Sequence, residues 1–190
     1  MKLAIFGGTF DPIHLAHVAM AREAIRRFEL DRVLLVPASI PPHKAGATQA
    51  GYEDRYRMVE LACGSDPLLE ASRLEAGSGR SYSIHTIEKV RAAQAPGDRL
   101  FFLIGADAFA EIRTWHHWQD VIREVEFIVA SRPGHRYAVP EGSRVHRLET
   151  LDLPVSSSEV RQKLARGEGP AEVPPAVLEY IRARHLYQAV

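Results

Sequence analysis

The sequence predicts a doubly wound α/β fold built on a parallel sheet. Short β-branched or aromatic runs alternate with longer amphipathic segments, the pattern of strands joined by crossover helices. The composition is that of an ordinary folded domain, with 46% hydrophobic and 25% charged residues. A chain of 190 residues can bury a substantial core. We therefore expect a single domain over residues 1–190, with a small helical extension over about residues 155–190.

Strands are expected where the apolar runs are most continuous. The clearest are Lys2 to Phe6, Val33 to Val36, Leu100 to Ile104 and Phe127 to Ala130. A weaker strand is expected within Leu68 to Leu74, before the glycine-rich turn Gly77 to Gly79. In such folds ligands bind at the carboxyl ends of the strands, so the loops that follow them are the candidate site.

Helices are expected where apolar residues recur every three or four positions. The first, His14 to Phe28, places five apolar side chains on one face: Leu15, Val18, Ala21, Ile25 and Phe28. The others are Tyr52 to Ala62, Ser83 to Ala93, Ser157 to Arg166 and Ala176 to Arg184. Three connections rich in Pro, Gly or charge separate these elements: Pro37 to Gly51, Arg132 to Gly142 and Gly167 to Pro175. The first is long enough to predict a functional loop.

Charge and cysteine content argue against several classes of partner. Lys plus Arg equals Asp plus Glu at 24 each, so no global field favours nucleic acid or an acidic membrane. Cys63 is the single cysteine, and neither a signal peptide nor a membrane span is visible. We expect a cytoplasmic protein that binds neither nucleic acid nor membrane, and these features leave a homo-oligomer open.

The first strand leads directly into two glycines and the start of a helix. Gly7 and Gly8 let the backbone turn sharply and approach a ligand, and the helix that begins near His14 offers unpaired N–H groups to a phosphate. The loop lacks the Gly-Lys-Ser/Thr of a Walker motif and the Gly-x-Gly-x-x-Gly of dinucleotide-binding folds. The pattern indicates a phosphate site of another kind.

His14 and His17 stand three residues apart at this helix start, so both rings can face the loop. The spacing fits a pair of phosphate donors as well as it fits a helix cap beside a core histidine. A zinc site is less favoured, because no third ligand is evident nearby and Cys63 has no cysteine partner.

Two segments resemble a known superfamily. The run Gly7-Gly8-Thr9-Phe10-Asp11-Pro12-Ile13-His14-Leu15-Ala16-His17 is similar to the His-x-Gly-His signature of the nucleotidylyltransferases, and Val155-Ser156-Ser157-Ser158-Glu159-Val160-Arg161 resembles their second signature. Further segments resemble the bacterial nicotinate-mononucleotide adenylyltransferase branch: Pro41 to Lys44, Ser81 to Thr86, Gly105 to Asp107, Trp115 to Trp118 and Arg132 to Gly134. Ala16 departs from the signature glycine, which leaves less room for a nucleotide.

The resemblance implies a Rossmann-like nucleotidyltransferase fold and transfer of the adenylyl group of ATP to nicotinate mononucleotide, with Mg²⁺ held largely by phosphates. It implies catalytic roles for His14, His17, Lys44 and Arg161. The implied ATP contacts are Gly7, Gly8, Thr9, Phe10, His14, His17, Gly105, Asp107, Ser156, Ser157 and Arg161. The implied acceptor contacts are Lys44, Thr86, Trp115, His116 and Arg132, with Trp115 stacked on the pyridine ring.

Plainer interpretations remain for several of these residues. Lys44 fits a solvated loop lysine as well as a cation on a lid formed by residues 41–51. Ser156 fits a simple helix cap followed by an exposed Arg161, and Asp107 also fits a helix cap. The alternative functions are a transferase acting on phosphopantetheine, a cytidylyltransferase, or a nucleotide-binding module without activity.

Overall fold

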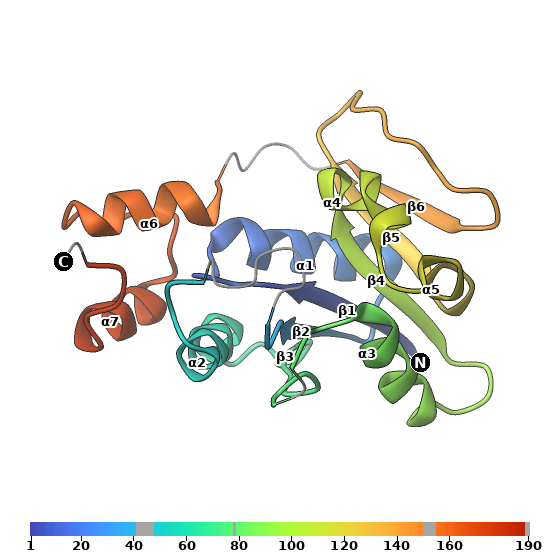
Figure 1. Ribbon diagram of the computed structural model, residues 1–190, viewed down its shortest axis with the longest axis horizontal. Coiled ribbons are helices and arrows are strands. Elements are labelled where there is room, and N and C mark those ends of the chain that lie inside the picture. Colours follow the sequence, from blue (N-terminus) through green and yellow to red (C-terminus); the bar gives the residue numbers. More distant parts are fainter. Residues whose placement is uncertain (41–47, 78, 150–154, 189–190) are drawn as a thin grey trace.

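The computed structural model describes residues 1–40, 48–77, 79–149 and 155–188. A six-stranded, fully parallel sheet forms its centre, in the order β3-β2-β1-β4-β5-β6 (Figure 1). The strands are β1 Lys2–Gly8, β2 Arg32–Pro37, β3 Leu69–Ala71, β4 Arg99–Gly105, β5 Glu126–Ser131 and β6 Arg144–Glu149. Strands β2 and β3 are added on one side of β1, and β4, β5 and β6 are added on its other side, so the strand order reverses between β1 and β4. The predicted doubly wound parallel sheet is therefore confirmed, and this reversal is where such sheets bind ligands.

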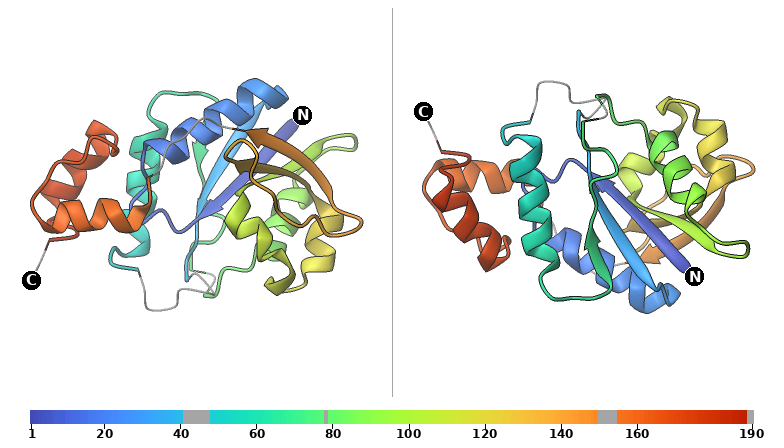
Figure 2. Two further views of the ribbon diagram at one scale, coloured as in Figure 1. Left: turned by 90° about the horizontal axis from the view of Figure 1, so that it is seen from above. Right: turned by 90° about the horizontal axis from the view of Figure 1, so that it is seen from below.

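Helices cover both faces of the sheet. They are α1 Leu15–Phe28, α2 Tyr52–Cys63, α3 Ser83–Ala92, α4 Ala106–Ala110, α5 Trp118–Glu124, α6 Ser157–Ala165 and α7 Pro175–Ala183, with a 3₁₀ turn at Ile112–Thr114. One buried cluster joins the sheet to α1, α2, α6 and α7, and a second joins it to α3, α4 and α5. Both views of Figure 2 place α6 and α7 together at the end of the molecule beside α2. None of the helices within the described ranges is long and apolar enough to cross a membrane.

Side-chain alternation along β1 explains the two layers. Ala4 and Phe6 belong to the cluster beneath α1, whereas Leu3 and Ile5 belong to the cluster beneath α3 to α5. Successive side chains of a strand point to opposite faces, so an uninterrupted apolar run fills both cores. The four predicted strong strands fall within β1, β2, β4 and β5, each one or two residues longer than expected at its ends.

Three features differ from the sequence prediction. Strand β6 was not expected, because at this edge of the sheet only Leu148 of the strand is buried. The short helices α4 and α5 were not expected either, since five and seven residues are too few to show a helical period. Leu15 lies at the exposed start of α1, 40% accessible, rather than on its buried face.

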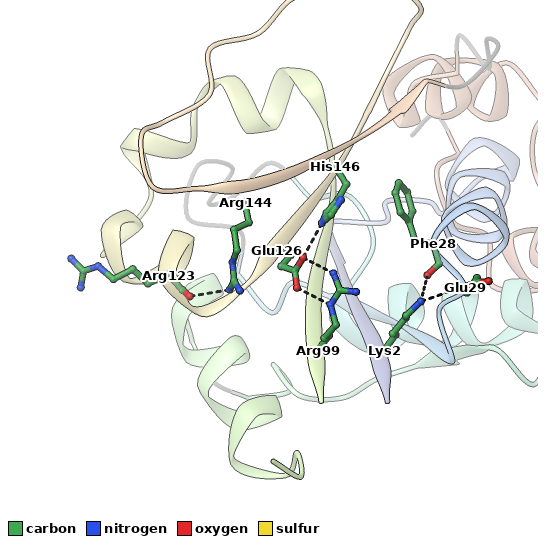
Figure 3. Close-up of polar contacts among 8 residues, drawn as sticks. All are labelled: Lys2, Phe28, Glu29, Arg99, Arg123, Glu126, Arg144 and His146. Carbon is green, nitrogen blue, oxygen red and sulfur yellow. Dashed lines mark hydrogen bonds and ion pairs between the residues drawn. The ribbon is translucent and has the colours of Figure 1, made fainter. Parts of the chain in front are cut away.

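A buried carboxylate joins the amino ends of three neighbouring strands. Glu126 at the start of β5 accepts hydrogen bonds from Nε and Nη2 of Arg99, at 3.0 and 2.8 Å, and lies 2.8 Å from Nε2 of His146 (Figure 3). The Arg99 hydrogen bonds, with that of His146, lower the pKa of Glu126 to about 2, although burial opposes this shift. The cluster lies at the amino ends of the strands, away from the predicted ligand edge.

The Glu126 cluster predicts a pH-dependent contribution to stability. Because its folded pKa of about 2 lies below the ordinary value of 4.5, the charged carboxylate stabilises the fold above pH 4.5, and this contribution is lost as the pH falls towards 2. Glu126→Gln should lower the free energy of unfolding by about 2 kcal/mol at pH 7, after allowance for the half-exposed Arg99. Urea unfolding at pH 7, 4 and 3 measures this, with the exposed Glu70→Gln as control. A mutational difference that stayed constant over these pH values would contradict the assignment.

Candidate active site

The loop after β1 is shaped by close packing around Gly8. Phe10 adopts a positive φ of 50° and folds back, so a Cβ on Gly8 would meet Cζ of its ring at 2.9 Å. Real Cβ atoms essentially never approach so closely, so a side chain at position 8 would displace the buried Phe10 ring. The Phe10 ring then packs edge-on against Phe6 at 5.6 Å and against His17 at 5.1 Å. The loop is therefore folded onto the core directly after β1.

His14 and His17 form a stacked pair at the start of α1. His14 caps the helix, which therefore begins one position later than predicted, and the backbone N–H of His14 donates to Nδ1 of His17 at 3.2 Å. The ring centroids lie 3.7 Å apart with the planes 23° from parallel. His14 is buried, and its Nδ1 has no hydrogen-bond partner within the described residues. The helix-cap interpretation is confirmed for His14, and the role of the pair as phosphate donors stays a prediction.

Burial keeps both imidazoles neutral. Desolvation lowers the pKa of His14 to about 4, with a small opposing effect from Glu172. Desolvation also holds the pKa of His17 well below its usual value, and the neighbouring His14 adds to this shift. Since Nδ1 of His17 accepts the His14 N–H, the proton of the neutral ring belongs on Nε2. His17 therefore offers an Nε2–H donor.

The second sequence signature lies directly against the first. Ser156 caps α6, and its Oγ accepts the N–H of Glu159 at 3.2 Å. Ser157 Oγ donates to the carbonyl of Pro12 at 3.0 Å, and Nη1 of Arg161 donates to the carbonyl of Asp11 at 2.7 Å. Ser156 is the helix cap of the plainer interpretation. Arg161, however, is half-buried and bound to the histidine loop rather than exposed.

Asp11 and Arg55 support this loop from beneath, and the sequence analysis assigned a role to neither. Asp11 is buried, and its carboxylate accepts the N–H groups of Gln49 and Ala50 at 2.8 and 3.1 Å and the hydroxyl of Tyr187 at 2.6 Å. Arg55 is only 1% exposed and donates to the carbonyl oxygens of Thr9, Ser39 and Ala50 at 2.8, 3.1 and 3.2 Å.

These contacts fix both ends of the connection between β2 and α2. Burial lowers the pKa of the Arg55 guanidinium, and the nearby Asp11 carboxylate opposes that effect. The burial of Arg55 could not be predicted from the sequence, because Arg55 looks like any polar residue of an amphipathic helix. The aspartate of the Phe-Asp-Pro turn was the one visible signal.

A cavity of about 550 Å³ opens beside the loop, at the carboxyl ends of β1, β2 and β4. Gly7, Gly8 and Thr9 line one part of it, and Tyr82, Trp115 and His116 line another. The His116 ring lies 4.5 Å from that of Tyr82, and Trp115 packs edge-on against Phe102 at 5.7 Å. A backbone turn suited to phosphate and a set of aromatic rings thus share one hollow.

The histidine pair and the cavity belong to different faces of the sheet. His17 packs on Phe6 and Phe10, which lie in the cluster beneath α1, whereas Phe102 and Ile104 of the opposite cluster line the cavity. The backbone of residues 7–9 joins the two parts. A ligand that reached both would therefore pass over this turn.

The structure does not bring every predicted residue to the cavity. Thr86 is buried behind it and donates to Glu75, which lines the wall, at 2.6 Å. Gly105 ends β4 and caps α4, so Asp107 is not the cap that one interpretation proposed. Asp107 and Arg132 are exposed past the ends of β4 and β5 and do not line the hollow. Lys44 and most of the proposed lid, residues 41–47, lie outside the described residues.

The chain matches the Cytidylyltransferase-like family model over residues 5–163. It therefore belongs to the Cytidylyltransferase-like family. A protein of Solibacter usitatus named "Probable nicotinate-nucleotide adenylyltransferase" is 65% identical over 187 residues, covering 98% of this chain and 100% of that relative. A protein of the same name from Moorella thermoacetica is 38% identical, covering 98% of this chain and 92% of that relative.

A solved structure shares the fold of this Cytidylyltransferase-like chain. The nicotinic acid mononucleotide adenylyltransferase of Plasmodium falciparum, complexed with NaAD, superposes with a TM-score of 0.81 over 98% of this chain and 97% of its own, at 19% identity. A likeness at this identity establishes the Rossmann-like architecture. The sequence resemblance to nicotinate-nucleotide adenylyltransferases is confirmed by the relatives from Solibacter and Moorella.

Proposed function

We propose that this protein is a nicotinate-nucleotide adenylyltransferase that transfers the adenylyl group of ATP to nicotinate mononucleotide, giving deamido-NAD and pyrophosphate in NAD biosynthesis. The main support for the proposal is the hollow that joins the Gly7–Thr9 turn to the aromatic rings of Tyr82 and Trp115, with the stacked histidines across this turn on the other face of the sheet. A phosphate-binding turn and a flat ring site in one cavity suit a pyridine mononucleotide that reacts at a phosphate. The relatives' names support the same reaction.

The reaction requires positioning and charge stabilisation rather than a protein nucleophile. An oxygen of the mononucleotide phosphate attacks the α-phosphorus of ATP in line, and the bond from that phosphorus to the bridging oxygen breaks to release pyrophosphate. Because His17 is neutral with its proton on Nε2, it donates a hydrogen bond to the α-phosphoryl oxygens as their charge rearranges. His14 fixes this orientation through its backbone N–H and the stacked ring.

The second signature provides the remaining phosphate donors in this proposal. Ser156 and Ser157 begin α6, so its first N–H groups and the Arg161 guanidinium are placed beside the histidine loop. Nη2 of Arg161 donates to Oγ of Ser158 at 3.2 Å, and the guanidinium has further N–H groups beyond those that hold Asp11 and Ser158 to offer to the β- and γ-phosphates. Lys44 is proposed to add a point charge from its loop, and Asp107 and Arg132 to contribute from the neighbouring strand ends.

Mg²⁺ accompanies ATP in this proposal and screens its charge. The described residues include no group of three histidines, cysteines or carboxylates that could hold a metal ion. In this proposal the phosphates of ATP provide most of the Mg²⁺ ligands. We also propose that residues 1–190 act as one domain, because Val160, Val177 and Tyr187 of the C-terminal part are buried in the same cluster as β1 and α1.

The acceptor preference tests the function directly. With ATP and Mg²⁺ the purified protein should release pyrophosphate when nicotinate mononucleotide is the acceptor. Its kcat/KM for nicotinamide mononucleotide should be lower by about tenfold or more, because a polar group would be mispaired. The amide presents donors where the carboxylate presents only acceptors. Phosphopantetheine and CTP serve as alternative substrates in the same assay. Preferred use of either of these would assign the chain to a sister activity.

A further inference from the structure

The cavity wall contains a cation that the proposed function has not used. Arg80 lines the hollow, and it is the one Arg or Lys among the described residues that do so. Two carboxylates, of Glu75 and Glu111, line the same hollow. No ion pair of Arg80 is found within the described residues, whereas Thr86 already donates to Glu75 at 2.6 Å. A ligand carrying a carboxylate would meet two like charges here and one opposite charge.

The backbone around Arg80 is held firmly in place. Arg80 forms a bridge with Ile40, whose N–H donates to the carbonyl of Gly79 at 3.2 Å and whose carbonyl accepts the N–H of Ser81 at 3.1 Å. Oγ of Ser81 also accepts the N–H of Ser39 at 2.7 Å. The stem of the Arg80 side chain therefore starts from a fixed point on the wall, which reduces the ordering needed when a ligand binds.

The position of Arg80 indicates which end of a bound mononucleotide it would contact. Arg80, in the bridge with Ile40, and Tyr82, whose backbone is extended, are two residues apart and both line the hollow. The Tyr82 ring lies 4.5 Å from that of His116, tilted by 35°, and both line the aromatic part of the hollow with Trp115. The Gly7–Thr9 turn, which suits phosphate, forms the other part. Arg80 is thus placed with the rings.

We propose that Arg80 determines acceptor specificity by pairing with the pyridine carboxylate of nicotinate mononucleotide. The proposal rests on the proposed function. A guanidinium presents two parallel N–H donors that match a carboxylate and has no acceptor to offer, so it discriminates against the amide of nicotinamide mononucleotide. It also offsets the repulsion between that carboxylate and the Glu75 and Glu111 side chains.

Steady-state kinetics with both acceptors at saturating ATP test the assignment. Arg80→Gln should raise KM for nicotinate mononucleotide by roughly 10- to 100-fold, the loss expected for a charge-assisted hydrogen bond, with little change in kcat. KM for nicotinamide mononucleotide should stay within about twofold, so the preference collapses. Arg80→Lys should recover part of the loss, because it restores the charge without the planar fork. Arg57→Gln, at an exposed position of α2 outside the cavity, is the matched control and should change neither KM.

Two results would overturn the proposal for Arg80. Equal losses with both acceptors would show that Arg80 meets the phosphate they share, and unchanged constants with both would show a solvated side chain. Calorimetric binding of nicotinate mononucleotide alone, to wild type and Arg80→Gln, separates this question from catalysis. A wild-type protein that adenylylated neither mononucleotide would overturn the proposed function. The ratio of the two binding constants would then still decide whether Arg80 holds the carboxylate.

Discussion

His17→Ala should lower kcat by about 100- to 1,000-fold while ATP binding changes little. The neutral ring offers its Nε2–H to oxygens whose charge rearranges in the transition state, so its contribution is larger there than in the ground state. Removal of one such donor costs about 2.7–4 kcal/mol of transition-state stabilisation. Single-turnover rates with nicotinate mononucleotide and calorimetric ATP binding provide the two measurements.

A second substitution separates the donor from the helix cap. His17 also accepts the backbone N–H of His14, and glutamine at the third helical position can perform this capping role. His17→Gln should therefore unfold at the same urea concentration as wild type but remain impaired in kcat. If His17→Gln instead restored full turnover, the ring would matter only for the cap, and the catalytic assignment would be wrong.

Arg55→Met should lower the free energy of unfolding by about 3–5 kcal/mol, the largest stability loss we expect from a single polar side chain. The variant leaves the carbonyl oxygens of Thr9, Ser39 and Ala50 without their donor in a largely buried region, and it leaves the buried Asp11 carboxylate without the nearby Arg55 cation. Urea unfolding monitored by circular dichroism measures the loss at pH 7.

Arg57→Met is the matched control for Arg55→Met, because it makes the same change two residues away on the exposed face of α2. It should shift stability by less than about 0.5 kcal/mol. Arg55→Lys should fall in between, since an ammonium retains the charge but cannot reach three carbonyl groups as a planar fork does. Loss of less than 1 kcal/mol in Arg55→Met would mean that water satisfies these carbonyls and that the loop does not depend on Arg55.

Much of the fold was predictable because the spacing of apolar residues along the sequence follows which side chains are buried. Strands β1, β2, β4 and β5 are buried on both faces, so each appears as an apolar run, and α1, α2 and α3 show one apolar face each. The edge strand β6 has a single buried residue and therefore no such run. The general rule for parallel sheets then located the site at the end of β1.

The site was predictable in its motifs but not in its contacts. Glycine at position 8 and the histidine pair follow from local geometry, which a short segment of sequence can record. The contacts of Arg161 with Asp11 and of Arg55 with Thr9 join residues 150 and 46 positions apart, and no local pattern encodes them. The hydrogen bond from the Thr86 hydroxyl to Glu75 was not predicted either, and the contact of Thr86 with the acceptor stays a prediction.

The hydrogen bond between Tyr187 and Asp11 has a consequence for the order of biosynthesis. The two residues are 176 positions apart, and Asp11 belongs to the first loop that a ribosome makes. At a synthesis rate of about 5–20 residues per second, Tyr187 is added on the order of 10–35 s after Asp11, so the hydrogen bond from its hydroxyl cannot form before then. Strands β1 and β2 can pair during that interval, but the loop after β1 acquires its full set of contacts only once α7 and Tyr187 have been translated. In a nascent chain, the β1–β2 pair can therefore form well before the loop after β1 has all of its contacts.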